Sequence, residues 1–187
     1  IGLLEAQELW LKFSELFFPV YNIKDFSQFN MGFRCIGTDV GNGEAVVMKK
    51  GEIISAIRAS MAIPSVFTAV DFNGRKLVDG GISRNFPAKD VKEMGSDFII
   101  GSNVAGGLLP SEKVRNIFQL LLQIAFFREA EDAKNEVPLC DIYIPINLQS
   151  FSMGSFNETD KILQIGIDAG RKMYPQFKHL ADSLNAI

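Results

Sequence analysis

The stretch "VFTAVDFNGRKLVDGG", Val66 to Gly81, is the strongest local indication of how this chain folds. Asn73-Gly74 lies between two short apolar runs, and this dipeptide favours a tight two-residue β-turn. The sequence therefore predicts a hairpin whose second strand ends at Asp79. Two interpretations of Asp79 remain open: a turn residue whose carboxylate accepts backbone N–H groups, or a general base at the end of a strand, where α/β proteins place their ligands.

A second hairpin is predicted before the first. The β-rich runs 33–40 and 44–50 are separated by Gly41-Asn42-Gly43, which is typical of a tight turn. Between the two hairpins, "GEIISAIRASMAIP" has apolar residues at helical spacing and predicts a short helix that Pro64 ends. Near the start of the chain, apolar residues at helical spacing predict an amphipathic helix that stops before Pro19.

The residues after Asp79 alternate between helical and strand patterns. We expect a helix over 87–95, a buried central strand over 97–104, a second strand over 141–146, and helices over 157–173 and 177–187. A long helix is expected from Glu112 to about Asn135, with Ser111 as its N-cap. This alternation predicts an α/β fold in which a layered sheet is flanked by helices.

Composition excludes several classes of function. With 187 residues the chain fits one domain, and a net charge of −3 without a basic stripe argues against nucleic acid as a partner. Its longest nearly apolar run, Ile117 to Phe127, is far shorter than the ~20 residues that span a membrane. Cys35 and Cys140 lack metal-site spacing, and no nucleotide-binding motif is present, so no metal and no cofactor are expected.

The residues of a serine hydrolase triad are not assembled in this sequence. His179 is the only histidine, and its place in the last helical pattern favours a solvated side chain over a catalytic one. No G-x-S-x-G nucleophile motif occurs between Ile1 and Ile187. Any interpretation of this chain as an acyl-transfer enzyme has to account for the absence of that motif.

Three ordered blocks nevertheless resemble one known family. The blocks are "AIRASMAIPSVF", "LVDGGISRNFP" and "KEMGSDFIIGSNV", and "TDVGNGEAVV" precedes them. Together they resemble the patatin-like phospholipase family over roughly Gly2 to Gly170. The matching positions are Arg58-Ala59-Ser60, Ile63-Pro64, Phe67, Asp79-Gly80-Gly81, Asn85 and Pro87.

The resemblance implies a lipid acyl hydrolase with a Ser-Asp dyad and no histidine. Its catalytic aspartate corresponds to Asp79, while Gly80, Gly81 and Asn85 form the supporting loop. The family's serine lies in a segment upstream of the matched blocks. We therefore expect residues 1–187 to be the C-terminal portion of one catalytic domain, incomplete on its N-terminal side and inactive alone. The chain then pairs with its missing half or self-associates, because apolar faces and strand edges need cover.

Two alternatives stay open. The scaffold could be a noncatalytic lipid-binding or interaction module, which the missing serine motif favours and the retained Asp79 disfavours. The aromatic residues of the first and long helices could line an acyl pocket or touch a membrane surface, or could simply pack in the core. These residues are Trp10, Phe13, Phe17, Phe18, Phe118, Leu121, Leu122, Phe126 and Phe127. The compartment is not specified by the sequence.

Overall fold

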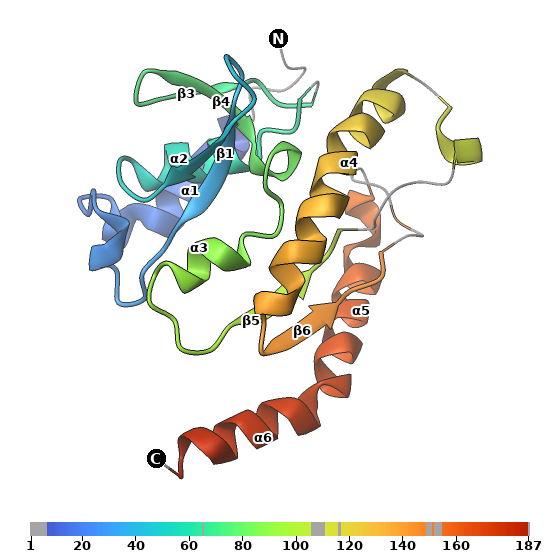
Figure 1. Ribbon diagram of the computed structural model, residues 1–187. Helices are drawn as coiled ribbons and strands as arrows, with labels where there is room; N and C mark the ends of the chain where they lie inside the picture. Colours follow the sequence, from blue (N-terminus) through green and yellow to red (C-terminus); the bar gives the residue numbers. More distant parts are fainter. Residues whose placement is uncertain are drawn as a thin grey trace. The chain divides into compact units, whose positions relative to one another are not determined.

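The computed structural model describes residues 7–64, 66–105, 111–115, 117–148, 151 and 155–186. The chain forms two compact units that divide between Asn85 and Phe86. Each combines helices with strands (Figure 1). The expected α/β class, consistent with a patatin-like fold, is thus confirmed, with a mostly antiparallel arrangement of strands.

The first unit is built on a four-stranded antiparallel sheet with strand order β2-β1-β4-β3. Its strands are β1 (Cys35–Asp39), β2 (Ala45–Met48), β3 (Val70–Phe72) and β4 (Arg75–Asp79). Both predicted hairpins are confirmed, because β1 pairs with β2 and β3 pairs with β4. At the second turn Asn73 and Gly74 have φ angles of 49° and 78°, the left-handed conformation that a type I′ turn requires.

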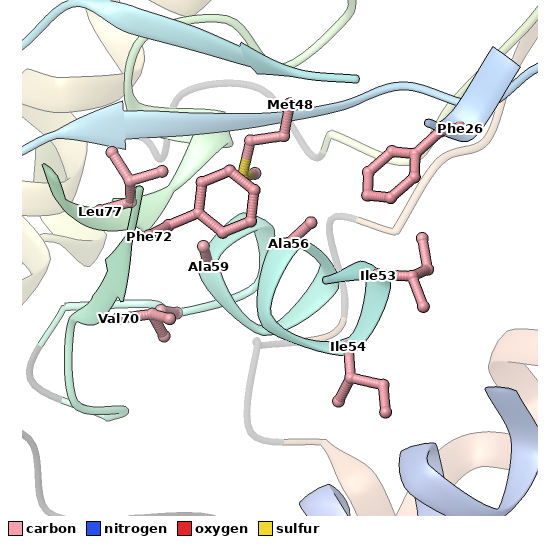
Figure 2. Packing of buried hydrophobic residues seen from close by; sticks show 10 residues of the cluster. Phe26, Met48, Ile53, Ile54, Ala56, Ala59, Val70, Phe72 and Leu77 are labelled. Carbon is pink, nitrogen blue, oxygen red and sulfur yellow. The ribbon is translucent and has the colours of Figure 1, made fainter. Parts of the chain in front are cut away.

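Helix α2 (Ile53–Ser60) supplies much of the core of the first unit. Its inward face carries Ile53, Ala56 and Ala59, which are buried with Met48 of β2 and Phe72 of β3 (Figure 2). Small alanines on this face let the helix approach the sheet closely. The helix ends at Ser60, with Met61 as its C-cap, before Pro64, as its sequence predicts.

Helix α1 (Gln7–Phe17) is followed by a 3-10 turn, Phe18–Val20. Trp10, Phe13 and Phe17 pack against the core of the first unit, which decides in favour of core packing for these three side chains. Phe18 does not join them, because 78% of its surface is exposed. The guanidinium of Arg58 lies 5.2 Å from the centre of the Trp10 ring, so a cation–π contact joins α1 to α2.

The described residues of the second unit form a two-stranded parallel sheet and four helices. Strand β5 (Ile100–Asn103) pairs with β6 (Ile142–Pro145), in register from Ile100 with Ile142. The helices are α3 (Ala88–Lys92), α4 (Ile117–Glu136), α5 (Thr159–Lys172) and α6 (Tyr174–Leu184). Short 3-10 turns are Phe26–Gln28 and Gly80–Ile82 in the first unit, and Ser111–Lys113, Val137–Leu139 and Phe156–Glu158 in the second.

Two expectations for the second unit were wrong. The strand over 97–104 is not a buried central strand, because β5 pairs with β6 alone among the described residues and Ile100 is 52% exposed. An apolar run becomes a buried strand only when a neighbouring layer of the structure covers it. The long helix begins at Ile117 and not at Glu112, because Val114 N–H donates to Ser111 O and closes a 3-10 turn there.

Among the long-helix residues that the sequence singled out, Phe118, Leu121, Leu122 and Phe126 lie in α4, but their side chains are outside the part that the structure describes. Phe127 is 53% exposed, so the core-packing interpretation does not hold for it. No helix within the described ranges is both long enough and apolar enough to cross a bilayer.

Candidate functional site

Asp79 is the last residue of β4, as the sequence predicts, and hydrogen bonds hold its N–H, its main-chain oxygen and its carboxylate. Its N–H donates to Ala62 O at 3.0 Å, just after α2. Its main-chain oxygen accepts the hydroxyl of Thr38 on β1 at 2.8 Å. Its Oδ1 accepts the N–H of Gly81 at 2.7 Å. The turn interpretation of Asp79 is therefore correct as a description of geometry, and this geometry fixes the carboxylate in one direction.

The second carboxylate oxygen of Asp79, Oδ2, differs from the first. Among the described residues it accepts no hydrogen bond, and no polar side-chain atom of those residues is both buried and unpaired. Oδ2 is therefore not fully buried, while Oδ1 is held by the turn. A carboxylate with one fixed oxygen and one accessible oxygen can accept a proton along a defined direction.

Burial changes the acidity of Asp79. Desolvation raises the pKa of this carboxyl above its ordinary value, and the hydrogen bond from Gly81 opposes part of that rise. The carboxylate that remains ionised is a stronger base than an exposed aspartate. Burial thus partly offsets the weakness of a carboxylate as a base for an alcohol.

The two positions after Asp79 favour glycine for different structural reasons. A Cβ on Gly80 would lie 2.2 Å from the main-chain oxygen of Ile36, which no side chain can accommodate. A Cβ on Gly81 would lie 3.0 Å from Oδ1 of Asn85 and 3.1 Å from Oδ1 of Asp79. Gly80 therefore allows β1 to approach the turn, whereas Gly81 leaves room for the side chains of Asp79 and Asn85.

The structure brings all four predicted site residues together in one turn. Asn85 is exposed at the end of the first unit, and its Oδ1 lies beside Gly81.

His179 is exposed on α6, in the second unit, and lines a surface hollow of about 530 Å³ with Asp141 and Leu180. The described residues contain no cluster of three or more histidine, cysteine or carboxylate side chains that could hold a metal ion.

Sequence reasoning did not single out two residues that lie beside this turn. Thr38 and Ser83 are buried, and their hydroxyl oxygens lie 2.8 Å apart behind Asp79. Thr38 belongs to the "TDVGNGEAVV" block, but no short-range pattern links it to a turn 41 residues later. Only the pairing of Gly37 with Asp79 across β1 and β4 places Thr38 there.

Comparisons with known proteins show which family this chain resembles. The family model described as patatin-like phospholipase matches residues 20–92. An uncharacterised NTE family protein of Mycobacterium tuberculosis is 30% identical over 105 residues, which is 56% of this chain and 28% of the relative. Lysophospholipase NTE1 of Lodderomyces elongisporus is 21% identical over 195 residues, covering 90% of this chain and 13% of the relative. Lysophospholipase NTE1 of Meyerozyma guilliermondii is 26% identical over 93 residues, 50% of this chain and 6% of the relative.

The matched segment contains both hairpins, α2 and the Asp79 turn. The chain spans less than a third of the length of these curated relatives. The resemblance of this chain to the patatin-like phospholipase family is thereby confirmed, and residues 20–92 are its patatin-like segment.

Proposed function

We propose that this chain is part of a lipid acyl hydrolase in which Asp79 is the general base of a Ser-Asp dyad. The observation that carries the proposal is the Asp79 turn, with Oδ1 held by Gly81 and Oδ2 left accessible. The family match and relatives named lysophospholipases support an ester of a lipid as the substrate class. No G-x-S-x-G motif is present in these 187 residues, so the serine comes from another segment of the same domain.

The chemistry needs no metal or organic cofactor. As the serine Oγ attacks the ester carbonyl, Oδ2 of Asp79 accepts the serine proton. Collapse of the tetrahedral intermediate breaks the ester C–O bond, and the departing alcohol takes the proton back. Water then attacks the acyl-serine, with Asp79 again accepting a proton and returning it to the serine oxygen.

The test is Asp79→Asn in the full-length protein. Asparagine keeps the shape, and its oxygen can still accept the Gly81 N–H, but the basic oxygen is lost. We expect hydrolysis of a lysophospholipid to fall by about 10⁴-fold, the scale seen when a catalytic aspartate becomes an amide. Asp71→Asn is the matched control, because Asp71 lies on β3 of the same sheet with its side chain 81% exposed. Turnover by Asp79→Asn within about tenfold of the parent would contradict the proposal.

A noncatalytic lipid-binding module is the second candidate, and the absence of the serine motif favours it. A fluorophosphonate probe separates the two, because it labels an activated serine and ignores a binding site. Labelling of the full-length protein that Asp79→Asn abolishes supports the hydrolase. Unlabelled protein that still binds lysophospholipid supports the module.

We further propose that residues 1–187 are the C-terminal portion of one catalytic domain and are inactive alone. Ile117, Leu120, Ile124 and Phe127 form an exposed apolar stripe at coiled-coil spacing on α4. A preceding segment of the same domain covers this stripe, or a second copy of the chain does. Residues 1–187 expressed alone should self-associate in light scattering and lack turnover of a short-chain ester. A monodisperse monomer, or measurable turnover, would refute the corresponding part of this proposal.

Contact with a membrane surface belongs to the same proposal. Phe18 follows α1 with 78% of its surface exposed, and Met31 is 83% exposed. Apolar side chains that are this accessible can enter the headgroup region of a bilayer. Replacing both with serine should reduce co-flotation of the full-length protein with phosphatidylcholine vesicles, while the turnover of a soluble ester stays at the parent value. Unchanged flotation would contradict the membrane contact.

A further inference from the structure

Two buried hydroxyl groups lie behind the Asp79 turn and take no part in the proton transfer described above. Thr38 is 3% exposed and Ser83 is 6% exposed. Their Oγ atoms are 2.8 Å apart, and Thr38 Oγ1 is also 2.8 Å from the main-chain oxygen of Asp79. A hydroxyl has a single proton, so when Thr38 donates to Asp79, Ser83 is the donor within the hydroxyl pair. The result is a directed series of hydrogen bonds, in which Ser83 donates to Thr38 and Thr38 donates to the carbonyl of Asp79.

These two hydrogen bonds complete the restraint of Asp79. The N–H of Asp79 is held by Ala62 on one side, and its carbonyl is held by Thr38 on the other. The next carbonyl, that of Gly80, accepts N–H groups from Ser83 at 3.1 Å and Arg84 at 2.8 Å. The peptide groups that contain the carbonyls of Asp79 and Gly80 are therefore both fixed, which sets the direction of the Asp79 carboxylate.

The hydroxyls are not needed simply to fill space. Burying a hydroxyl carries a desolvation cost that a valine or alanine of similar shape avoids. A fully paired buried network can in return hold one geometry strictly. Here the network ends on the peptide of the residue whose accessible oxygen has to meet a serine.

We propose that Thr38 and Ser83 are positioning residues that fix the direction of Asp79 Oδ2 in the hydrolysis reaction. Neither touches the substrate, and each acts through the backbone of the Asp79 turn. This inference rests on the proposed function, because it gives Asp79 the role of base. It adds to that function a second layer of residues, reached from β1 and from the 3-10 turn after Asp79.

The test compares Thr38→Val, Thr38→Ser and Ser83→Ala in the full-length protein with a soluble ester. Valine keeps the shape of threonine without its donor, so kcat should fall about 10- to 100-fold while KM stays near the parent value. Serine keeps the hydroxyl and should stay within about threefold of the parent. Ser83→Ala should lower kcat less, because Thr38 can still donate to Asp79.

A double-mutant comparison tests whether Ser83 acts through Thr38. Once Thr38 has lost its hydroxyl, Ser83 no longer acts through it, so Thr38→Val with Ser83→Ala should equal Thr38→Val alone. Strictly additive effects of the two substitutions on kcat would overturn the proposal that Ser83 acts through Thr38. A purely structural role would instead lower the folded fraction, measured by circular dichroism, and leave kcat per folded molecule unchanged, which would overturn the proposal.

Asp79→Asn in the same assay separates the two levels of inference. If Asp79→Asn keeps its activity, both the general base and its positioning residues are wrong. If Asp79→Asn loses activity while Thr38→Val keeps the parent kcat and KM, only the positioning role is wrong. If Thr38→Val does not fold, Ser83→Ala decides, and a parent kcat in that variant overturns the proposal.

Discussion

Substituting the two adjacent glycines of the turn with alanine should produce two different defects. At Gly80 the new Cβ would lie 2.2 Å from the oxygen and 2.7 Å from the carbon of the Ile36 carbonyl. Because ordinary C···O contacts begin near 3.3 Å, the backbone of β1 or of the turn must move by about 1 Å. This movement stretches the pairing of Gly37 with Asp79 and the bond from Thr38 to Asp79.

The cost of Gly80→Ala follows from these contacts. Two weakened hydrogen bonds contribute about 1 kcal/mol each, and overpacking against a backbone adds about 1–3 kcal/mol. We therefore expect the free energy of unfolding of the first unit to fall by about 3–5 kcal/mol. Urea unfolding of residues 1–187, followed by the fluorescence of Trp10, measures this, because Trp10 is the only tryptophan in these residues and packs against the core of that unit.

Gly81→Ala is the matched comparison. Its Cβ would press on the side-chain oxygens of Asp79 and Asn85, at 3.1 and 3.0 Å, and these atoms can move by a few tenths of an ångström. The free energy of unfolding should change by less than about 1 kcal/mol, while hydrolysis by the full-length protein should fall about tenfold or more. Near-parent stability for Gly80→Ala, or equal losses of stability in both variants, would refute the reasoning.

Three further outcomes are expected. Burial raises the pKa of Asp79, so the favourable neutral form contributes to stability below the ordinary aspartate pKa, and this contribution is lost as pH rises through the folded-state pKa. Asp79→Asn should therefore be at least as stable as the parent near about pH 7, with the difference shrinking towards about pH 3 in urea unfolding; a variant less stable at both pH values would contradict this. Burial raises the pKa of the Cys35 thiol to about 12, so Cys35 should react with a thiol reagent at about pH 8 much more slowly than Cys140, unless urea is added. Equal rates in the folded protein would count against the burial of Cys35. Gly166→Ala in α5, where nothing lies within 4 Å of the new Cβ, should raise stability by up to about 1 kcal/mol in thermal unfolding, and a loss of stability would show that this helix position is constrained.

The sequence predicts those parts of the fold that depend on neighbouring residues. Asn73-Gly74 and Gly41-Asn42-Gly43 specify both hairpins, because the left-handed backbone that a tight turn needs is open to few residue types. Pro64 likewise marks the end of the α2 segment. The position of Asp79 at the end of β4 follows directly from the second hairpin.

Features that depend on distant residues could not be predicted in this way. The apolar run around Ile100 reads as a buried strand, but burial depends on which layers cover it, and β5 has a single strand partner among the described residues. The start of α4 was misplaced because the 3-10 turn at Ser111 has the same polar composition as a helix N-terminus. Thr38 and Ser83 escaped notice because their contact spans 45 residues.

The register between β1 and β4 has a consequence for how this part of the protein is assembled during folding. Each hairpin closes over a few residues and can form early, whereas the Thr38–Asp79 contact must close a loop of 41 residues. We therefore expect the carboxylate to be aligned late in folding, after both hairpins have come together. A nascent chain can hold two finished hairpins before the carboxylate of Asp79, the proposed general base, has been aligned.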